Sequence, residues 1–92
     1  MIRTIRHKGL KRLVTRNDRS GLGAEQLPRI MSVIDLLDIA TVPQDLDLPG
    51  HHLHSLRGDL KGFWSVRITG NFRLIFRMED GNVFDVDLLD YH

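Results

Sequence analysis

Residues 63–90 read FWSVRITGNFRLIFRMEDGNVFDVDLLD, and this stretch decides the fold. Apolar and polar residues alternate in three successive runs along it, and such alternation predicts strands with one buried and one exposed face. The runs are separated by Thr69-Gly70-Asn71 and by Glu79-Asp80-Gly81-Asn82, whose compositions are typical of hairpin turns. With a further strand expected from His52 to Leu56, the second half predicts a meander of about four antiparallel strands.

The first half of the chain has helical periodicity. Apolar residues spaced by three or four predict a helix from His7 to about Arg16 and a longer one from about Ala24 to Ala40. Pro28 fits the longer helix only near its first turn, where a missing amide hydrogen costs nothing. Residues 3–5 are expected to form a short first strand, and residues 42–50 a loop with at most one helical turn.

Together these elements predict one α+β domain over residues 1–92. Its two N-terminal helices should pack on one face of a mostly antiparallel sheet of four to five strands. Strict alternation places Phe84, Val86 and Leu88 of the last strand on the helix-covered face. The opposite face should then display three arginines together, namely Arg67, Arg73 and Arg77.

Composition narrows the chemistry. The 92 residues are 41% hydrophobic and 27% charged, as in an ordinary folded domain, and they include no cysteine. Disulfides, thiolate metal sites and a cysteine nucleophile are therefore excluded. No apolar run is long enough for a membrane helix and no signal peptide is evident, so we expect no membrane association and a cytoplasmic location.

Charge is unevenly distributed although the net charge is only +1. Lysines and arginines concentrate in residues 1–19 and 57–77, whereas residues 20–56 and 78–90 are acidic. Two basic blocks in a nearly neutral protein indicate a directed attraction for a polyanion such as nucleic acid. An ordinary solvated surface remains the alternative interpretation.

Side chains that suit RNA chemistry gather in the strand region and at residues 90–92. Cleavage of RNA without a metal needs a base for the 2′-hydroxyl, a fixed cation for the phosphate and an acid for the leaving 5′-oxygen. Histidine suits both proton transfers, arginine binds two phosphate oxygens at once, and tyrosine can stack on a base. An ordinary structural role stays open for each residue of the group. Its members are His54, Arg57, Lys61, Arg73, Arg77, Asp90, Tyr91 and His92.

A metal site is a weaker alternative. His51, His52 and His54 lie close together in the sequence, and His7 and His92 could add ligands. Within one strand, His52 and His54 would point to the same side and could converge on an ion. No spacing characteristic of a zinc site supports this interpretation, so no metal and no cofactor is predicted.

Five segments in order resemble the HigB branch of the RelE/ParE toxins. The family's opening pattern corresponds to Ile5-Arg6-His7-Lys8-Gly9-Leu10, and its central His-Pro-Leu-Lys-Gly segment to His54-Ser55-Leu56-Arg57-Gly58. Its Gly-x-Trp stretch corresponds to Gly62-Phe63-Trp64, and its Asn-Trp-Arg strand to Asn71-Phe72-Arg73. The family's terminal Asp-Tyr-His is present as Asp90-Tyr91-His92.

The resemblance implies a toxin of a type II toxin–antitoxin system that cuts messenger RNA in the A site of the 70S ribosome. It also implies a HigA-like helix-turn-helix antitoxin as partner, with operator DNA bound only through the antitoxin complex. Within the site, it makes His54 and His92 the acid–base pair, Asp90 and Tyr91 their supporting residues, and Arg73 the group that steadies the phosphate.

Further contacts are expected around these catalytic residues. The basic N-terminal helix is expected to contact ribosomal RNA through Lys8, Lys11 and Arg12. Two departures from the family pattern stand next to the site: Ser55 replaces a proline and Arg57 replaces a lysine, while Phe72 for tryptophan is a milder change. The residues expected to contact the substrate are Arg57, Lys61, Arg67 and Arg77.

Two other functions remain possible from the sequence. A ParE-like toxin shares this fold and inhibits DNA gyrase by protein contact, but it lacks the terminal tyrosine and histidine. An RNA- or ribosome-binding module would use the basic face for affinity alone. Asp90-Tyr91-His92 favours the nuclease over both.

Overall fold

A computed structural model describes residues 1–90 of the chain. It contains two helices, two short 3-10 turns and four strands, and both helices precede the four strands, as the sequence predicts. Within this described part, no helix is both long and apolar enough to cross a membrane. The elements are α1 (Lys8–Arg16), α2 (Leu27–Ile39), η1 (Pro43–Leu46), β1 (His54–Ser55), η2 (Gly58–Leu60), β2 (Trp64–Thr69), β3 (Phe72–Glu79) and β4 (Asn82–Asp90).

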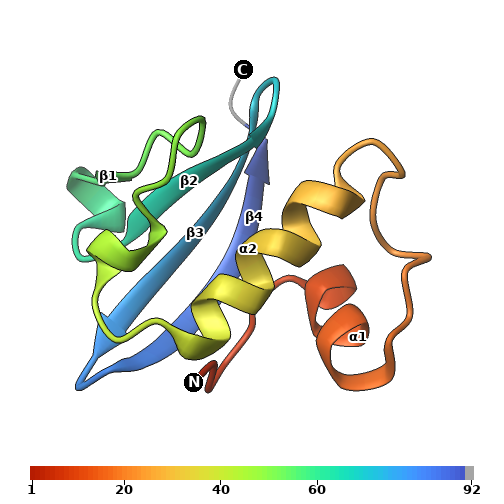
Figure 1. The fold of residues 1–92 in the computed structure, drawn as a ribbon, viewed down its shortest axis with the longest axis horizontal. Helices are drawn as coiled ribbons and strands as arrows, with labels where there is room; N and C mark the ends of the chain where they lie inside the picture. The colour runs from red at the N-terminus through yellow and green to blue at the C-terminus, as the bar shows by residue number, and fades with distance from the viewer. Residues whose placement is uncertain (91–92) are drawn as a thin grey trace.

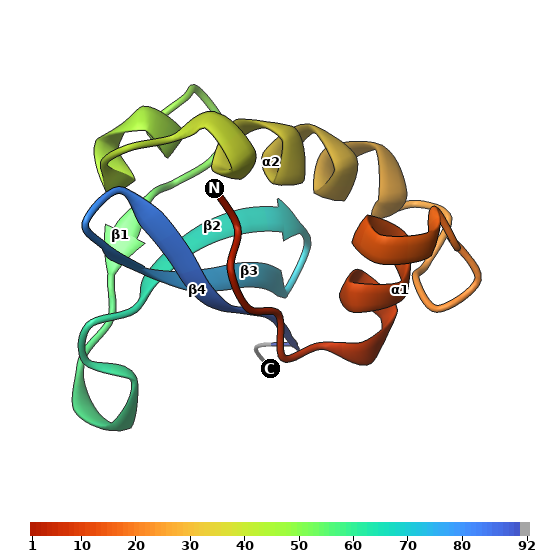
Figure 2. The same cartoon turned by 90° about the horizontal axis from the view of Figure 1, so that it is seen from below.

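The strands form one antiparallel sheet in the order β1-β2-β3-β4. Helix α2 lies across one face of this sheet and α1 packs beside it, near the β4 edge (Figures 1 and 2). Apolar side chains from both helices and the three longer strands meet in a single core between these layers. The predicted α+β arrangement, with both helices on one side, is confirmed. The core consists of Leu10, Leu13, Ile30, Val33, Leu37, Ala40, Leu46, Val66, Ile68, Leu74, Phe76, Val83 and Val86.

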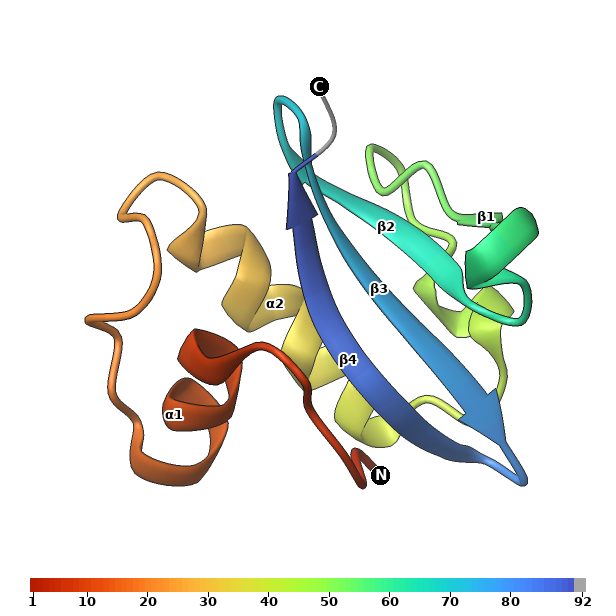
Figure 3. The same cartoon turned by 180° about the vertical axis from the view of Figure 1, so that it is seen from behind.

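The N-terminal segment runs along the outer edge of β4 (Figure 3). It makes two isolated parallel bridges, between Ile2 and Val83 and between Ile5 and Val86, instead of the short strand predicted over residues 3–5. The backbone amide of Arg3 donates to Val83 O at 2.7 Å in the first of them. The segment thereby covers part of an otherwise unpaired strand edge, which is a common site of unwanted pairing.

Helix boundaries follow local chemistry. Helix α1 begins after His7, whose Nδ1 accepts a hydrogen bond from the backbone amide of Leu10 at 3.2 Å. It ends before Asn17, which caps the helix with a left-handed φ of 54°. Helix α2 begins at Leu27, three residues later than expected, because residues 24–26 form a turn. Pro28 lies in its first turn, as predicted.

A bulge in β4 places one residue on a different sheet face from the one that strict alternation predicts. The pairing with β3 shifts between Ile75, which faces Asp87, and Arg77, which faces Phe84. The extra residue is Asp85, whose φ of 56° breaks the alternation. Residue 84 therefore changes face: Val83 and Val86 are buried in the core, whereas Phe84 lies on the opposite face, and the expectation that it shares the core face was wrong.

The edge strand β1 is shorter than predicted. It contains only His54 and Ser55, instead of residues 52–56. The reason lies in His52, whose φ of 49° is left-handed and cannot belong to a strand. The expectation that His52 and His54 project from one strand to the same side was therefore wrong. Both hairpin turns are confirmed, and the second, at Asp80 and Gly81, has the two positive φ values of a type I′ turn.

Candidate functional site

The face of the sheet away from α2 carries the predicted histidine. His54 of β1 is paired with Ser65 of β2, which is paired with Ile75 of β3 and, through it, with Asp87 of β4. Directly opposed residues in an antiparallel sheet project from the same face. His54 is exposed at the sheet edge, whereas Ser65 and Ile75 in the middle are buried.

The adjoining row of cross-strand partners on the same face carries two arginines, and we call it the arginine row. Arg67 of β2 is paired with Arg73 of β3, which is paired with Leu89 of β4. Arg67 is exposed and Arg73 is half-buried. The structure therefore brings His54, Arg67 and Arg73 to one face, as alternation along the strands predicts.

Ser65 connects the two rows. Its side chain is fully buried, and its hydroxyl oxygen accepts from Nη1 of Arg73 at 3.5 Å, while His54 is its cross-strand partner. Sequence reasoning missed this residue. Its position two residues before Arg67 was the available signal, because it places a hydroxyl on the arginine face. A buried polar atom with a charged donor restricts where the guanidinium can lie.

The His54 ring is held by a hydrogen bond to the backbone, which selects its tautomer. Its Nδ1 lies 3.0 Å from the carbonyl oxygen of His52. Because a carbonyl can only accept, Nδ1 carries the hydrogen, and the lone pair of the neutral ring is then on Nε2. The ring atom that points away from its own backbone is thus the one able to take a proton.

Arg77 is separated from Arg73 by the row that contains Ile75, and it is bound to carboxylates. Its Nε donates to Asp85 Oδ2 at 2.9 Å and its Nη1 to Glu79 Oε1 at 3.1 Å. The guanidinium carbon lies 5.2 Å from the centre of the Phe84 ring, and Arg6 reaches Asp85 from the N-terminal segment at 3.4 Å. Any contact between Arg77 and a substrate phosphate must therefore compete with these pairs.

Asp85 is a second residue that sequence reasoning missed. Its hydrogen bond from Arg77, and to a lesser extent the charges of Arg6 and Arg77, hold its pKa below the usual value, while partial burial opposes this shift. The same hydrogen bond, donated by Arg77 to Asp85, raises the pKa of Arg77. The carboxylate at the bulge therefore ties the N-terminal segment to β3.

The Asp85 pair should give the fold a pH dependence. A carboxylate whose pKa is lowered by folding stabilises the fold above the unfolded pKa, near 4, and this contribution disappears as the pH falls through the lower folded value. We expect Asp85→Asn to lower the urea midpoint at pH 7 by roughly a few tenths of a molar. The difference from the unsubstituted chain should shrink below pH 4.

Circular dichroism during urea titration at pH 7 and pH 3 measures this difference. Glu79→Gln is the matched control, because it removes the more exposed carboxylate that contacts the same Arg77. A midpoint for Asp85→Asn that is shifted equally at both pH values would contradict an electrostatic role.

Arg57 and Lys61 lie away from the sheet face. Both are exposed and flank η2 in the loop between β1 and β2, beyond the edge strand that carries His54. Gly62, with a φ of 95°, adopts a conformation that other residues rarely do and turns this loop back toward β2. The loop places both cations near the edge of the sheet that carries His54, and neither belongs to the row that contains Arg67 and Arg73.

The basic residues of α1 form a separate surface. Lys8 and Lys11 are exposed, and Arg12 is half-buried with its Nε 3.6 Å from Asp18. Helix α1 lies by the β4 side of the sheet, whereas His54 is at the opposite, β1 edge (Figure 2). The predicted ribosome contacts and the predicted catalytic face therefore point to different parts of the molecule.

The three residues of the predicted terminal motif are only partly described. Asp90 is exposed, ends β4 and is paired with Phe72, one position along from Arg73. Tyr91 and His92 lie outside the described residues. The register therefore places Asp90 one position beyond Arg73, and its pairing with Phe72 assigns it to the helix-covered face rather than to the face of Arg73.

The histidines do not gather around a metal position. Among residues 1–90, no group of three His, Asp or Glu side chains is arranged to hold an ion. His7 caps α1, and His51 is buried with its Nδ1 3.0 Å from Leu46 O. Each of these two rings therefore has a structural role.

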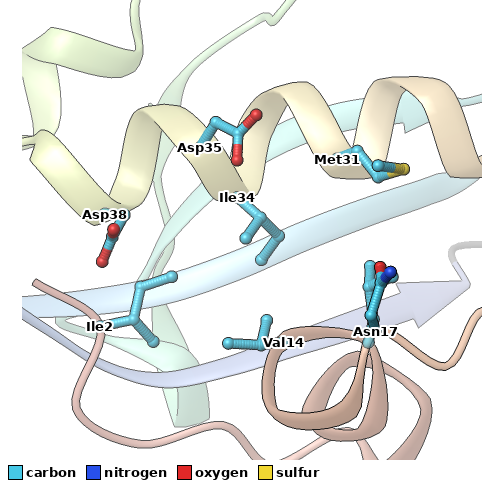
Figure 4. A pocket seen from close by; sticks show the side chains of 8 residues that line it. Ile2, Val14, Asn17, Met31, Ile34, Asp35 and Asp38 are labelled. Carbon is cyan, nitrogen blue, oxygen red and sulfur yellow. The ribbon is translucent and has the colours of Figure 1, made fainter.

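A pocket of about 300 Å³ lies between α1 and α2, away from the arginine face (Figure 4). Ile2, Val14, Met31 and Ile34 give it an apolar lining, and the strands pass behind it. Of the catalytic residues predicted from the sequence, those that the structure describes, His54, Arg73 and Asp90, do not line this pocket. Its polar lining residues are Asn17, Asp35 and Asp38.

Solved structures share this fold. YafQ from Escherichia coli superimposes with a TM-score of 0.66 at 16% identity, covering 98% of this chain and 91% of the other. YoeB in the YoeB–YefM toxin–antitoxin complex of Staphylococcus aureus gives a TM-score of 0.62 at 18% identity, covering 100% and 95%. Identities this low show the fold alone, and that fold is the one found in small RelE-like toxins.

The sequence comparisons are more specific. The family model described as RelE-like toxin of type II toxin-antitoxin system HigB matches residues 3–92. Endoribonuclease HigB of Proteus vulgaris is 35% identical over 92 residues, which is the whole of both chains. Toxin HigB-1 of Vibrio cholerae is 41% identical over 49 residues, about half of each chain. The chain belongs to the HigB-like toxin family.

Proposed function

We propose that the chain is an endoribonuclease that cuts messenger RNA in the ribosomal A site by metal-free acid–base catalysis. The full-length similarity to a protein named Endoribonuclease HigB supports the activity. The open sheet face supports the chemistry, because a histidine and an arginine lie there on either side of one buried hydroxyl. This placement of His54 and Arg73 around Ser65 is the observation that carries the proposal.

The reaction needs no group beyond side chains and the RNA itself. One of His54 and His92 takes the proton from a 2′-hydroxyl, whose oxygen then attacks the adjacent phosphorus. The bond from phosphorus to the 5′-oxygen breaks, and the other histidine protonates this leaving oxygen. The products are a 2′,3′-cyclic phosphate and a 5′-hydroxyl end, so every proton and bond is accounted for.

Arg73 supplies the fixed positive charge. Charge grows on the non-bridging oxygens as the phosphorus becomes five-coordinate, and a guanidinium can contact two of them at once. Its hydrogen bond to Ser65 holds it in place before the substrate arrives. Asp90 and Tyr91 are proposed to support the histidines, and Tyr91 to stack on a base.

The remaining basic residues are proposed as contacts to RNA. Arg57 and Lys61 would meet the transcript from the η2 loop, and Arg67 from the arginine row. Arg77 would contribute only where the phosphate competes with Asp85 and Glu79. On the other surface, contacts to ribosomal RNA would come from Lys8, Lys11 and Arg12.

The partner proposed is a HigA-like helix-turn-helix antitoxin. A type II family implies a protein antitoxin, and YoeB of the same fold is described in complex with YefM. Operator DNA would be bound only through the toxin–antitoxin complex. The toxin itself would act in the cytoplasm, where translating ribosomes present the substrate.

Mapping transcript ends after controlled expression tests the proposal. New 5′ ends inside translated codons should appear within minutes of induction and should be absent when translation is blocked beforehand. An Arg73→Ala chain expressed to the same level is the control for unrelated degradation. Growth arrest with intact transcripts would replace the nuclease with a ParE-like gyrase inhibitor, and no arrest would favour an RNA-binding module.

A further inference from the structure

Within residues 1–90, a second pocket, next to Arg67, is lined by basic side chains and by no carboxylate. It has a volume of about 390 Å³, and residues 68–70, where β2 turns into β3, form part of its lining. Three separate parts of the chain contribute a basic side chain to it: α2, the segment before β1, and β2. Its lining residues are Arg29, Gly50, His52, Arg67, Ile68, Thr69 and Gly70.

The two arginines of this pocket are not neutralised. The ion pairs found within residues 1–90 involve Arg6, Arg12 and Arg77, and neither Arg29 nor Arg67 has a carboxylate within ion-pair distance there. Glu25, in the turn just before α2, lines an adjoining groove, and no ion pair joins it to Arg29 within residues 1–90. Two arginines that line one pocket without a counter-charge create a local attraction for an anion.

Arg29 is held in the pocket by backbone rather than by a side chain. Its Nη1 donates to the carbonyl oxygen of Gly50 at 3.4 Å. Gly50 has a φ of 84°, and a Cβ atom at this position would lie only 3.7 Å from the same nitrogen. The loop therefore passes close to the guanidinium. Its carbonyl oxygen binds one guanidinium nitrogen, while the positive charge has no carboxylate partner in the described part of the chain.

The pocket is continuous with the proposed catalytic face. Arg67 lines the pocket and is also the cross-strand partner of Arg73. The backbone of Arg67 donates to His51 O at 2.7 Å, which keeps the segment containing His52 beside β2. An RNA strand with one phosphate at Arg73 can therefore run past Arg67 and place another phosphate in the pocket.

We propose that this pocket, formed by Arg29, His52 and Arg67, binds a second phosphodiester of the RNA strand that is cut at Arg73. The inference rests on the proposed nuclease function and adds a subsite to it. Arginine binds phosphate through two parallel hydrogen bonds, and backbone phosphate contacts fix the register of a nucleic acid without reading its sequence. The subsite would hold the strand while the histidines act on the neighbouring linkage.

Titration of the 15N-labelled chain with a 2′-O-methylated RNA hexanucleotide tests binding apart from cleavage. A methylated 2′-oxygen has no proton to lose, so the strand binds but is not cut. We expect the amide signals of Gly50, Thr69 and Gly70 to shift during the titration. Arg29→Gln should remove most of these shifts and weaken binding roughly 3- to 10-fold, lowering the slope of log affinity against log salt by about 0.7.

Arg19→Gln is the matched control. It removes the same charge from the exposed turn between α1 and α2, outside the pocket, so the pocket amides should still shift. The proposal is overturned if these amides do not move with RNA, or if Arg29→Gln and Arg19→Gln behave alike. Because the RNA is uncleavable, a failure of the nuclease function would appear in the transcript mapping and leave this binding result intact.

Discussion

Arg73→Ala is expected to slow RNA cleavage on programmed ribosomes by roughly 10²- to 10³-fold. The substitution removes the fixed charge that would stabilise the five-coordinate phosphorus, and water cannot supply a preorganised replacement. Single-turnover kinetics with excess toxin measure the cleavage step itself. Arg73→Lys should recover only part of the rate, because an ammonium keeps the charge but cannot contact two phosphate oxygens as a planar fork.

A matched variant separates chemistry from loss of the fold. Arg67→Ala removes the cross-strand partner of Arg73 on the same face. It should weaken RNA binding while changing the single-turnover rate at saturation far less. Equal losses of rate in both variants would contradict a specific role for Arg73, provided that circular dichroism shows both chains folded.

The positioning role of Ser65 has its own signature. Ser65→Ala keeps the charged side chain of Arg73 but removes the hydroxyl that accepts a hydrogen bond from its guanidinium. We expect a smaller loss of rate than for Arg73→Ala, and almost no further loss when the two substitutions are combined, because both act through one group. Additive losses would show that Ser65 does not act through Arg73.

Strand alternation predicted the main features of the candidate site. It placed Arg67 and Arg73 on one face and the hydrophobic partners of α2 on the other, because a period of two leaves no other arrangement for a half-buried strand. It failed in β4, where Asp85 inserts one extra residue and moves Phe84 across the sheet. The spacing of three between Val83 and Val86 was the only trace of this bulge in the sequence.

Long-range contacts could not be read from the sequence. The neutralisation of Arg77 depends on Asp85, whose neighbourhood is set by the bulge, and on the N-terminal segment that brings Arg6 there. The pocket at Arg29 joins α2 to a loop 21 residues later through Gly50. Patterns along the chain describe one element at a time, so they do not show which charges remain uncompensated after the elements pack.

His54→Ala is expected to lower the single-turnover cleavage rate roughly 10²- to 10⁴-fold, as for the loss of a general acid or base. Dependence on pH distinguishes this role from a structural one. With Nδ1 donating to His52 O, Nε2 is the ring atom that exchanges the proton. The variant should therefore lose one limb of the pH–rate profile, the acidic limb if His54 is the base and the alkaline limb if it is the acid.

Added imidazole provides the control. His54 is exposed at the edge of the sheet, so a free imidazole can occupy the space left by alanine. It should restore part of the rate to His54→Ala and none to Arg73→Ala, because only the first variant lacks a proton carrier. A His54→Ala chain with an unchanged pH–rate profile and no response to imidazole would remove His54 from the proton transfers. The acid–base chemistry would then have to rest on other groups near Arg73, with His92 and Tyr91 as the first to be substituted.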